Sequence, residues 1–153
     1  MKRRAALVFA SLLAFPACGG SSGALNVDVE TLDGRMVQLS DEIGGGMRVV
    51  SLWAVWCQPC KRELPDLARL QRSHAVDVIA LDIGDEAERV QTFLDDLGIE
   101  IRVLLDPDGR GLAAFGASSV PATFIVDADG RVVWEHLGAV GENDVAMALE
   151  RLR

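Results

Sequence analysis

Two cysteines separated by two residues, Cys57 and Cys60, are the side chains in this sequence best suited to chemistry. They follow a strongly apolar run, residues 49–55, which predicts a buried strand, and precede residues 61–74, which predict a helix. Cys57 is therefore expected at a helix N-terminus, where unpaired backbone N–H groups and the helix dipole stabilise a thiolate. Cys60 lies one turn further along, so it can attack Cys57 and release a partner held there as a mixed disulfide.

The same cysteine spacing also occurs in structural zinc sites, which need four ligands. Besides the pair, the sequence offers only Cys18, His74 and His136, and these form no second cluster. The short Cys-x-x-Cys ring removes little chain entropy from the unfolded state, which argues against a purely structural disulfide. We therefore interpret the pair as a redox-active disulfide that needs no metal and no other cofactor, and both histidines as solvated or capping side chains.

Residues 1–17 have the three parts of an export signal: a basic start, an apolar stretch and a small residue, Ala17. The apolar stretch is shorter than the roughly 20 residues that span a bilayer as a helix. The composition of residues 18–25 predicts a flexible tether. The start of the chain is similar to a bacterial lipoprotein signal, with a lipidated Cys18 as the mature N-terminus. Cleavage after Gly19, which discards this cysteine, is the alternative.

Length and composition restrict the rest of the chain, residues 26–153, to one acidic domain. The net charge of the whole chain is −8, and it becomes −11 without the leader, which carries three basic and no acidic side chains. So acidic a surface disfavours nucleic acid and tolerates basic or neutral protein partners. A lone Cys-x-x-Cys pair in an exported protein indicates a catalyst of thiol chemistry.

Strands and helices are expected to alternate along the domain. Apolar and polar residues alternate around Asp33 and Gly34, which predicts an early hairpin. Residues 76–82 have the composition of a buried strand, and Asp85 with Glu88 has the spacing of a helix capping pair. The other expected elements are strands at residues 103–105, 119–126 and 132–134 and helices near residues 90–97, 112–115 and 142–152. Together they predict an α/β fold with a mixed central sheet flanked by helices, and the cysteine pair at the carboxyl end of a central strand.

From about Val27 to Leu152 the chain resembles the thioredoxin superfamily, and within it the TlpA/ResA-type (AhpC/TSA-Redoxin-like) thiol-disulfide oxidoreductases. The residues that carry the resemblance are 52–60, 63–65, 120–127 and Gly130. The resemblance implies a thioredoxin-like fold. It also identifies residues 85–105 as the helix and strand that this subfamily inserts into the basic fold.

The resemblance also implies roles for single residues. Cys57 is the nucleophile, Cys60 the resolving thiol, and Pro121 a cis proline whose loop lies against the disulfide. The cis bond leaves the backbone of the preceding Val120 able to pair with an incoming extended chain. Trp56 is expected to form an apolar wall beside the nucleophile. The residues expected to contact substrate are Trp56, Gln58, Pro59, Val120 and Pro121.

The proton chemistry of the buried thiol is expected to differ from that of thioredoxin. Thioredoxins carry a buried aspartate six residues before the first cysteine, where this chain has Ser51. Glu63 lies six residues after Cys57, where ResA-type members carry a glutamate. We expect Glu63 to exchange a proton with Cys60, directly or through water. A solvated helix residue is the alternative, since glutamates are usually exposed.

The sequence therefore predicts an extracytoplasmic thiol-disulfide oxidoreductase, anchored on the periplasmic side of a membrane through Cys18, or soluble in the periplasm if cleavage occurs elsewhere. The dipeptide Gln58-Pro59 favours a reductase, because strong oxidants often place a histidine between their cysteines. Expected partners are disulfide-containing or dithiol proteins, with the Cys-x-x-Cys-His site of apocytochrome c as one example in cytochrome c maturation, and a membrane electron donor.

Two alternatives use the same sulfurs differently. A peroxiredoxin-like peroxidase would oxidise Cys57 to a sulfenic acid. It needs Thr or Ser three residues before the nucleophile, where this chain has Ala54. A copper metallochaperone would use both thiols as soft ligands. Copper chaperones of related fold space their cysteines by three residues, whereas this chain spaces them by two.

Overall fold

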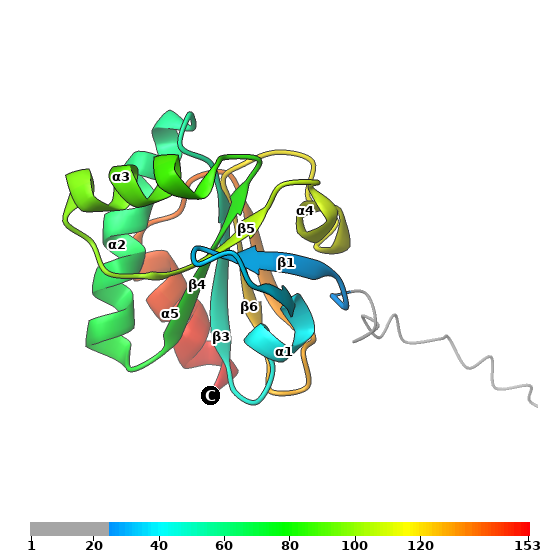
Figure 1. Cartoon of the computed structure of the whole chain (residues 1–153). Coiled ribbons are helices and arrows are strands. Elements are labelled where there is room, and N and C mark those ends of the chain that lie inside the picture. Colours follow the sequence, from blue (N-terminus) through cyan, green and yellow to red (C-terminus); the bar gives the residue numbers. More distant parts are fainter. Residues whose placement is uncertain (1–24) are drawn as a thin grey trace, which may run out of the picture.

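The computed structural model describes residues 25–153, which are built around a seven-stranded sheet (Figure 1). The strands, in their order across the sheet, are β2 (Met36–Gln38), β1 (Asp28–Thr31), β5 (Arg102–Asp106), β4 (Asp77–Ile83), β3 (Arg48–Trp53), β6 (Ala122–Val126) and β7 (Val132–Leu137). Strands β3, β4 and β5 are parallel, and every other neighbouring pair is antiparallel. The expected leader and Cys18 lie outside the described residues.

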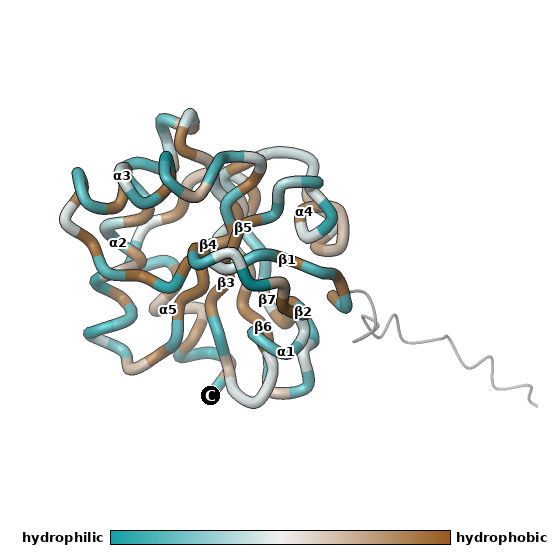
Figure 2. Tube along the Cα trace, in the orientation of Figure 1, coloured by the Kyte–Doolittle hydropathy of each residue, from teal (hydrophilic) through white to brown (hydrophobic). Residues whose placement is uncertain are grey.

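Helices cover both faces of the sheet, so the expected architecture is confirmed. The helices are α1 (Leu39–Ile43), α2 (Gln58–His74), α3 (Ala87–Leu97), α4 (Arg110–Ala114) and α5 (Glu142–Leu152). Helices α2, α3 and α5 lie on one side of the sheet and α1 and α4 on the other (Figure 1). Hydrophobic residues follow the central strands (Figure 2). Along β3, Val50 and Leu52 pack toward α1, whereas Val49 and Trp53 pack toward α2, α3 and α5, as the period of a strand requires.

The early hairpin, the inserted helix and strand, and the closing hairpin of β6 and β7 are all present. Helix α2 begins at Gln58, three residues earlier than the sequence predicted, because Pro59 is tolerated in the first turn of a helix, where its missing N–H costs nothing. The predicted capping pair is wrong. The N-cap of α3 is Glu86, which makes no side-chain capping bond, and Asp85 has a distant partner instead.

Within residues 25–153, the longest helices are too short or too polar to cross a membrane.

Candidate active site

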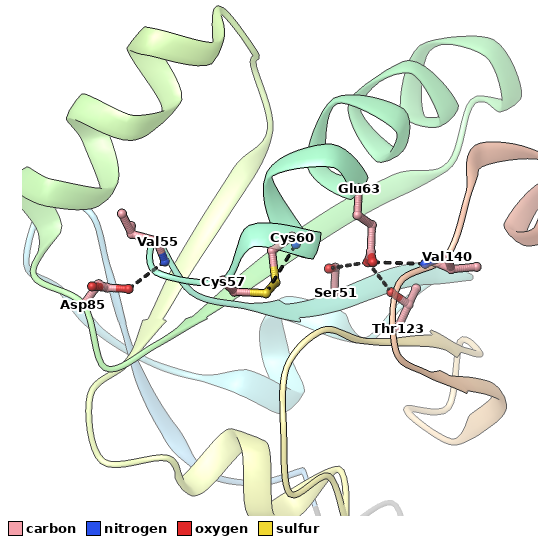
Figure 3. Close-up of a disulfide and its surroundings, with 8 residues drawn as sticks. All are labelled: Ser51, Val55, Cys57, Cys60, Glu63, Asp85, Thr123 and Val140. Atoms are coloured by element: carbon pink, nitrogen blue, oxygen red, sulfur yellow. Dashed lines mark hydrogen bonds between the residues drawn. A yellow bond between two sulfur atoms is a disulfide. The ribbon is translucent and has the colours of Figure 1, made fainter.

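Cys57 and Cys60 form a disulfide at the start of α2, at the carboxyl end of β3 (Figure 3). Cys57 is the N-cap residue of the helix, with extended backbone dihedrals of φ −82° and ψ 105°. Its Sγ accepts a hydrogen bond of 3.3 Å from the backbone N–H of Cys60. This N–H belongs to the first turn and has no partner within the helix. The same donor and the helix dipole are therefore in place to stabilise a thiolate on Cys57 in the reduced protein.

The residues that flank the two cysteines are partly exposed. Trp56 precedes Cys57 and is 62% exposed, although Cys57 and Cys60 are themselves nearly buried. Gln58 is also exposed, and Pro59 is half-buried. The structure thus exposes Trp56 and Gln58, the residues on either side of Cys57, at the surface.

The loop before β6 packs onto the same region. The peptide bond between Val120 and Pro121 is cis, as the resemblance implied. Val120 is half-buried against the apolar cluster that contains both cysteines. The carbonyl of Pro121 accepts a hydrogen bond of 2.9 Å from the backbone N–H of Gly138, which ties this loop to the end of β7.

Glu63 lies in the next turn of α2 after Cys60, and its side chain is buried rather than solvated. Its carboxylate accepts hydrogen bonds from the Thr123 hydroxyl at 2.7 Å, the Ser51 hydroxyl at 3.2 Å and the Val140 N–H at 3.2 Å (Figure 3). Burial raises the pKa of Glu63 above its ordinary value, and the three donors oppose that rise. In the part of the chain that the structure describes, no hydrogen bond joins this carboxylate directly to either sulfur.

A second buried acidic group supports the opposite side of the motif, and sequence reasoning missed it. Asp85 accepts a hydrogen bond of 2.7 Å from the backbone N–H of Val55, two residues before Cys57 (Figure 3). Asp82, at the end of β4, accepts one of 3.0 Å from the N–H of Asp85. The signal that could have found Asp82 is a carboxyl group directly after the apolar residues 78–81, where burial is expected.

The two histidines lie on separate elements. His74 ends α2, and its Nδ1 is 2.8 Å from the Ser73 hydroxyl. His136 is half-buried on β7, opposite Thr123 of β6, and its ring stacks on Trp134. No group of three potential metal ligands is assembled among the described residues.

Comparison with known proteins gives consistent matches. The sequence model of the AhpC/TSA family matches residues 22–135. The thiol-disulfide oxidoreductase ResA of Bacillus subtilis is 33% identical over 125 residues, which are 80% of this chain and 69% of that protein.

Solved structures agree with the sequence matches. The MTB dsbF structure, described in its mixed oxidized and reduced forms, superposes with a TM-score of 0.75 at 26% identity and covers 85% of this chain and 97% of its own. The exposed lipoprotein thioredoxin Etrx1 of Streptococcus pneumoniae superposes with a TM-score of 0.66 at 25% identity, covering 82% of this chain and 98% of its own.

Proposed function

The chain belongs to the AhpC/TSA family and is a thiol-disulfide oxidoreductase with a thioredoxin-like fold, and on this basis we propose that it reduces protein disulfides outside the cytoplasm. The observation that carries the proposal is the position of Cys57 as N-cap of α2, with the Cys60 N–H directed at its sulfur. A thiolate held there is the attacking group that disulfide exchange requires.

The reaction begins when the Cys57 thiolate attacks one sulfur of a partner's disulfide. The partner's S–S bond breaks, a mixed disulfide forms, and the partner's other sulfur leaves as a thiolate that takes up a proton. The Cys60 thiol then loses its proton and attacks the Cys57 sulfur, which releases the second partner thiolate and forms the disulfide seen in this structure. Two electrons pass from the cysteine pair to the partner.

Glu63 is the group we assign to the Cys60 proton. It lies one turn along the same helix, and its hydrogen bond to the Ser51 hydroxyl extends the buried polar site toward the end of β3 that leads into the motif. A buried carboxylate with a raised pKa can take up a proton near neutral pH more readily than an exposed one. Because no hydrogen bond joins this carboxylate to either sulfur among the described residues, we assign the transfer of the Cys60 proton to a bridging water molecule.

The partner is proposed to bind as an extended chain. It would pair with the backbone of Val120, next to the cis Pro121, and pack on the exposed face of Trp56, beside Gln58 and Pro59. The acidic composition of the chain favours neutral or basic partners. Apocytochrome c is one partner of this kind, and a thiol-relay protein in the membrane is the proposed electron donor. Lipidation of Cys18, the proposed anchor, is in keeping with the similarity to a lipoprotein thioredoxin.

The test is capture of the partner by a variant that cannot resolve the mixed disulfide. Cys60→Ala, expressed with its leader, is expected to accumulate a covalent adduct through Cys57 that dithiothreitol releases and mass spectrometry identifies. The matched control is the double variant with Cys57→Ala, which forms no such adduct. A redox titration gives the direction: a potential close to that of strong oxidants such as DsbA, about −120 mV, would refute the reductase assignment.

A further inference from the structure

The turn that leads into the redox motif is held from the side of β4 and α3. The Val55 N–H donates to Asp85 Oδ2 at 2.7 Å (Figure 3), and Arg89 Nη1 lies 3.2 Å from the other oxygen, Oδ1. The Asp85 N–H in turn donates to Asp82 Oδ1 at 3.0 Å. The Cys57 N–H closes the turn on the Ala54 carbonyl at 3.0 Å. A continuous series of contacts therefore connects the end of β4 to the backbone that places the nucleophile.

Asp82 is the unusual member of this series. It is fully buried and pairs across the sheet with Trp53 of β3 and Leu105 of β5, both of which belong to the apolar cluster that contains the cysteines. Its Oδ2 has no hydrogen-bond partner among the residues that the structure describes. An ionised oxygen without a donor is costly in such a site, whereas a protonated one can itself donate a hydrogen bond.

Burial and the neighbouring Asp85 carboxylate favour the neutral form of Asp82. Burial raises the pKa of Asp82 to about 7, the Asp85 N–H opposes the rise, and the like charge of the Asp85 carboxylate adds to it. Arg89 acts in the opposite direction from the surface, where it is paired with Asp85. From β3 and β5 the strand partners of Asp82 are uncharged.

We propose that Asp82 and Asp85 form a proton-dependent clamp on the turn before Cys57. With one proton on Asp82, the pair carries a single negative charge, and the Asp85 carboxylate is free to hold the Val55 N–H. Loss of that proton places two like charges next to each other, which weakens the hold and adds negative charge near the sulfurs. Both effects disfavour the thiolate and so favour the disulfide. These are positioning residues, because neither one touches a sulfur.

This inference rests on the proposed function and adds to it a pH response independent of Glu63. The test compares wild type with Asp82→Asn, in which an amide keeps the acceptor atom for the Asp85 N–H but cannot ionise. The equilibrium constant with glutathione is measured from pH 5.5 to pH 8.5. The variant is expected to match wild type within about twofold at the acidic end and to shift about threefold or more toward the dithiol above pH 7.5.

Asp85→Asn provides a second, independent readout. It removes the like charge but keeps an acceptor for the Val55 N–H, so the midpoint of the wild-type pH response is expected to move to lower pH by about half a unit or more. Asp96→Asn, an exposed carboxylate on the same helix α3, is the matched control and should leave the curve unchanged. If Asp82 or Asp85 had only a structural role, its substitution would change the equilibrium constant by the same factor at every pH.

Two results overturn the clamp: an Asp82→Asn curve parallel to that of wild type, or an Asp85→Asn midpoint that does not move. Thermal unfolding of each variant confirms that the protein measured is folded. If wild type itself exchanges no electrons with glutathione or insulin disulfides, the proposed function fails. If wild type does exchange electrons but the pH curves of wild type and Asp82→Asn are parallel, only the clamp fails.

Discussion

Glu63 and Asp82 are both buried carboxyl groups on the α2 side of the sheet, but their hydrogen-bond partners differ. Glu63 accepts from three donors, two hydroxyls and a backbone N–H. Asp82 accepts from one backbone N–H, and its second oxygen has no partner in the described part of the chain. Burial raises both pKa values, but near Glu63 the donors and His136 oppose the rise, whereas near Asp82 the neighbouring Asp85 charge reinforces it. Both acids therefore favour their protons more than an exposed carboxyl would, but the donors limit this preference at Glu63, whereas a like charge strengthens it at Asp82.

The difference in hydrogen-bond partners suits the two carboxyl groups to different roles. A carboxylate with a complete set of donors can gain or lose a proton while its surroundings stay in place, which suits a proton acceptor for Cys60. A carboxyl with an unpaired oxygen changes the contacts around it when it ionises, which suits control of a neighbouring turn.

The largest effect is expected from removing the attacking sulfur of Cys57, on which the proposed roles of both acids depend. Cys57→Ser should lower the rate of insulin-disulfide reduction by about 10³-fold or more, because a hydroxyl does not replace a thiolate in disulfide exchange. On this background, Glu63→Gln and Asp82→Asn should have no further effect on the rate. Residual exchange that still responds to either acid would show that the two carboxyls act on something else.

The next largest effect is expected at Glu63, whose two carboxylate oxygens both accept hydrogen bonds. Glu63→Gln is expected to slow the resolution of a preformed mixed disulfide by about 10²-fold at neutral pH, the low end of what general base catalysis contributes. Wild-type resolution should accelerate as pH rises through the raised pKa of Glu63, and the variant should lose this acceleration. Glu150→Gln, an exposed glutamate on α5, is the control. An unchanged pH profile would leave Glu63 with a structural role only.

For Asp82 the corresponding prediction concerns stability. Its folded-state pKa of about 7 lies above the ordinary value of 3.8, so between these pH values the folded protein binds more protons than the unfolded chain. The free energy of unfolding therefore falls as pH rises through this window. Asp82→Asn should remove that fall and exceed wild type by about 2 kcal/mol at pH 8, with little difference at pH 4. Urea titrations at both pH values measure this, and a constant difference between the two proteins would contradict it.

The smallest expected effect tests whether the donors distinguish the two acids. Thr123→Val removes the shortest hydrogen bond to Glu63, at 2.7 Å, without changing the shape of the side chain greatly. It should cost about 1 kcal/mol of stability and move the midpoint of the resolution profile to higher pH, because one of the groups that oppose the raised pKa is lost. A midpoint that stays in place would mean that burial alone sets the proton affinity of Glu63.

Long apolar runs and the cysteine spacing were enough to predict the central strands, the helices that flank them and the position of Cys57 at a helix start. The burial of Glu63 could not be decided in this way. Its donors Ser51, Thr123 and Val140 lie 12, 60 and 77 residues away in sequence, so only the folded sheet brings them together.

The error at Asp85 has a similar origin. Its spacing to Glu88 matches a local capping pattern, but the carboxylate binds the Val55 N–H 30 residues earlier, where a buried donor needs an acceptor. The need of the buried Val55 N–H for an acceptor therefore outweighed the local capping preference of Asp85.

The most direct test is the ionisation of the Cys57 thiol. It is followed in Cys60→Ser by the pH dependence of iodoacetamide alkylation, with the modified peptide identified by mass spectrometry. Thiolate formation at clearly lower pH than in free cysteine is the expected result, because the sulfur caps the N-terminus of α2. Ionisation at the same pH as free cysteine, or higher, would contradict the account.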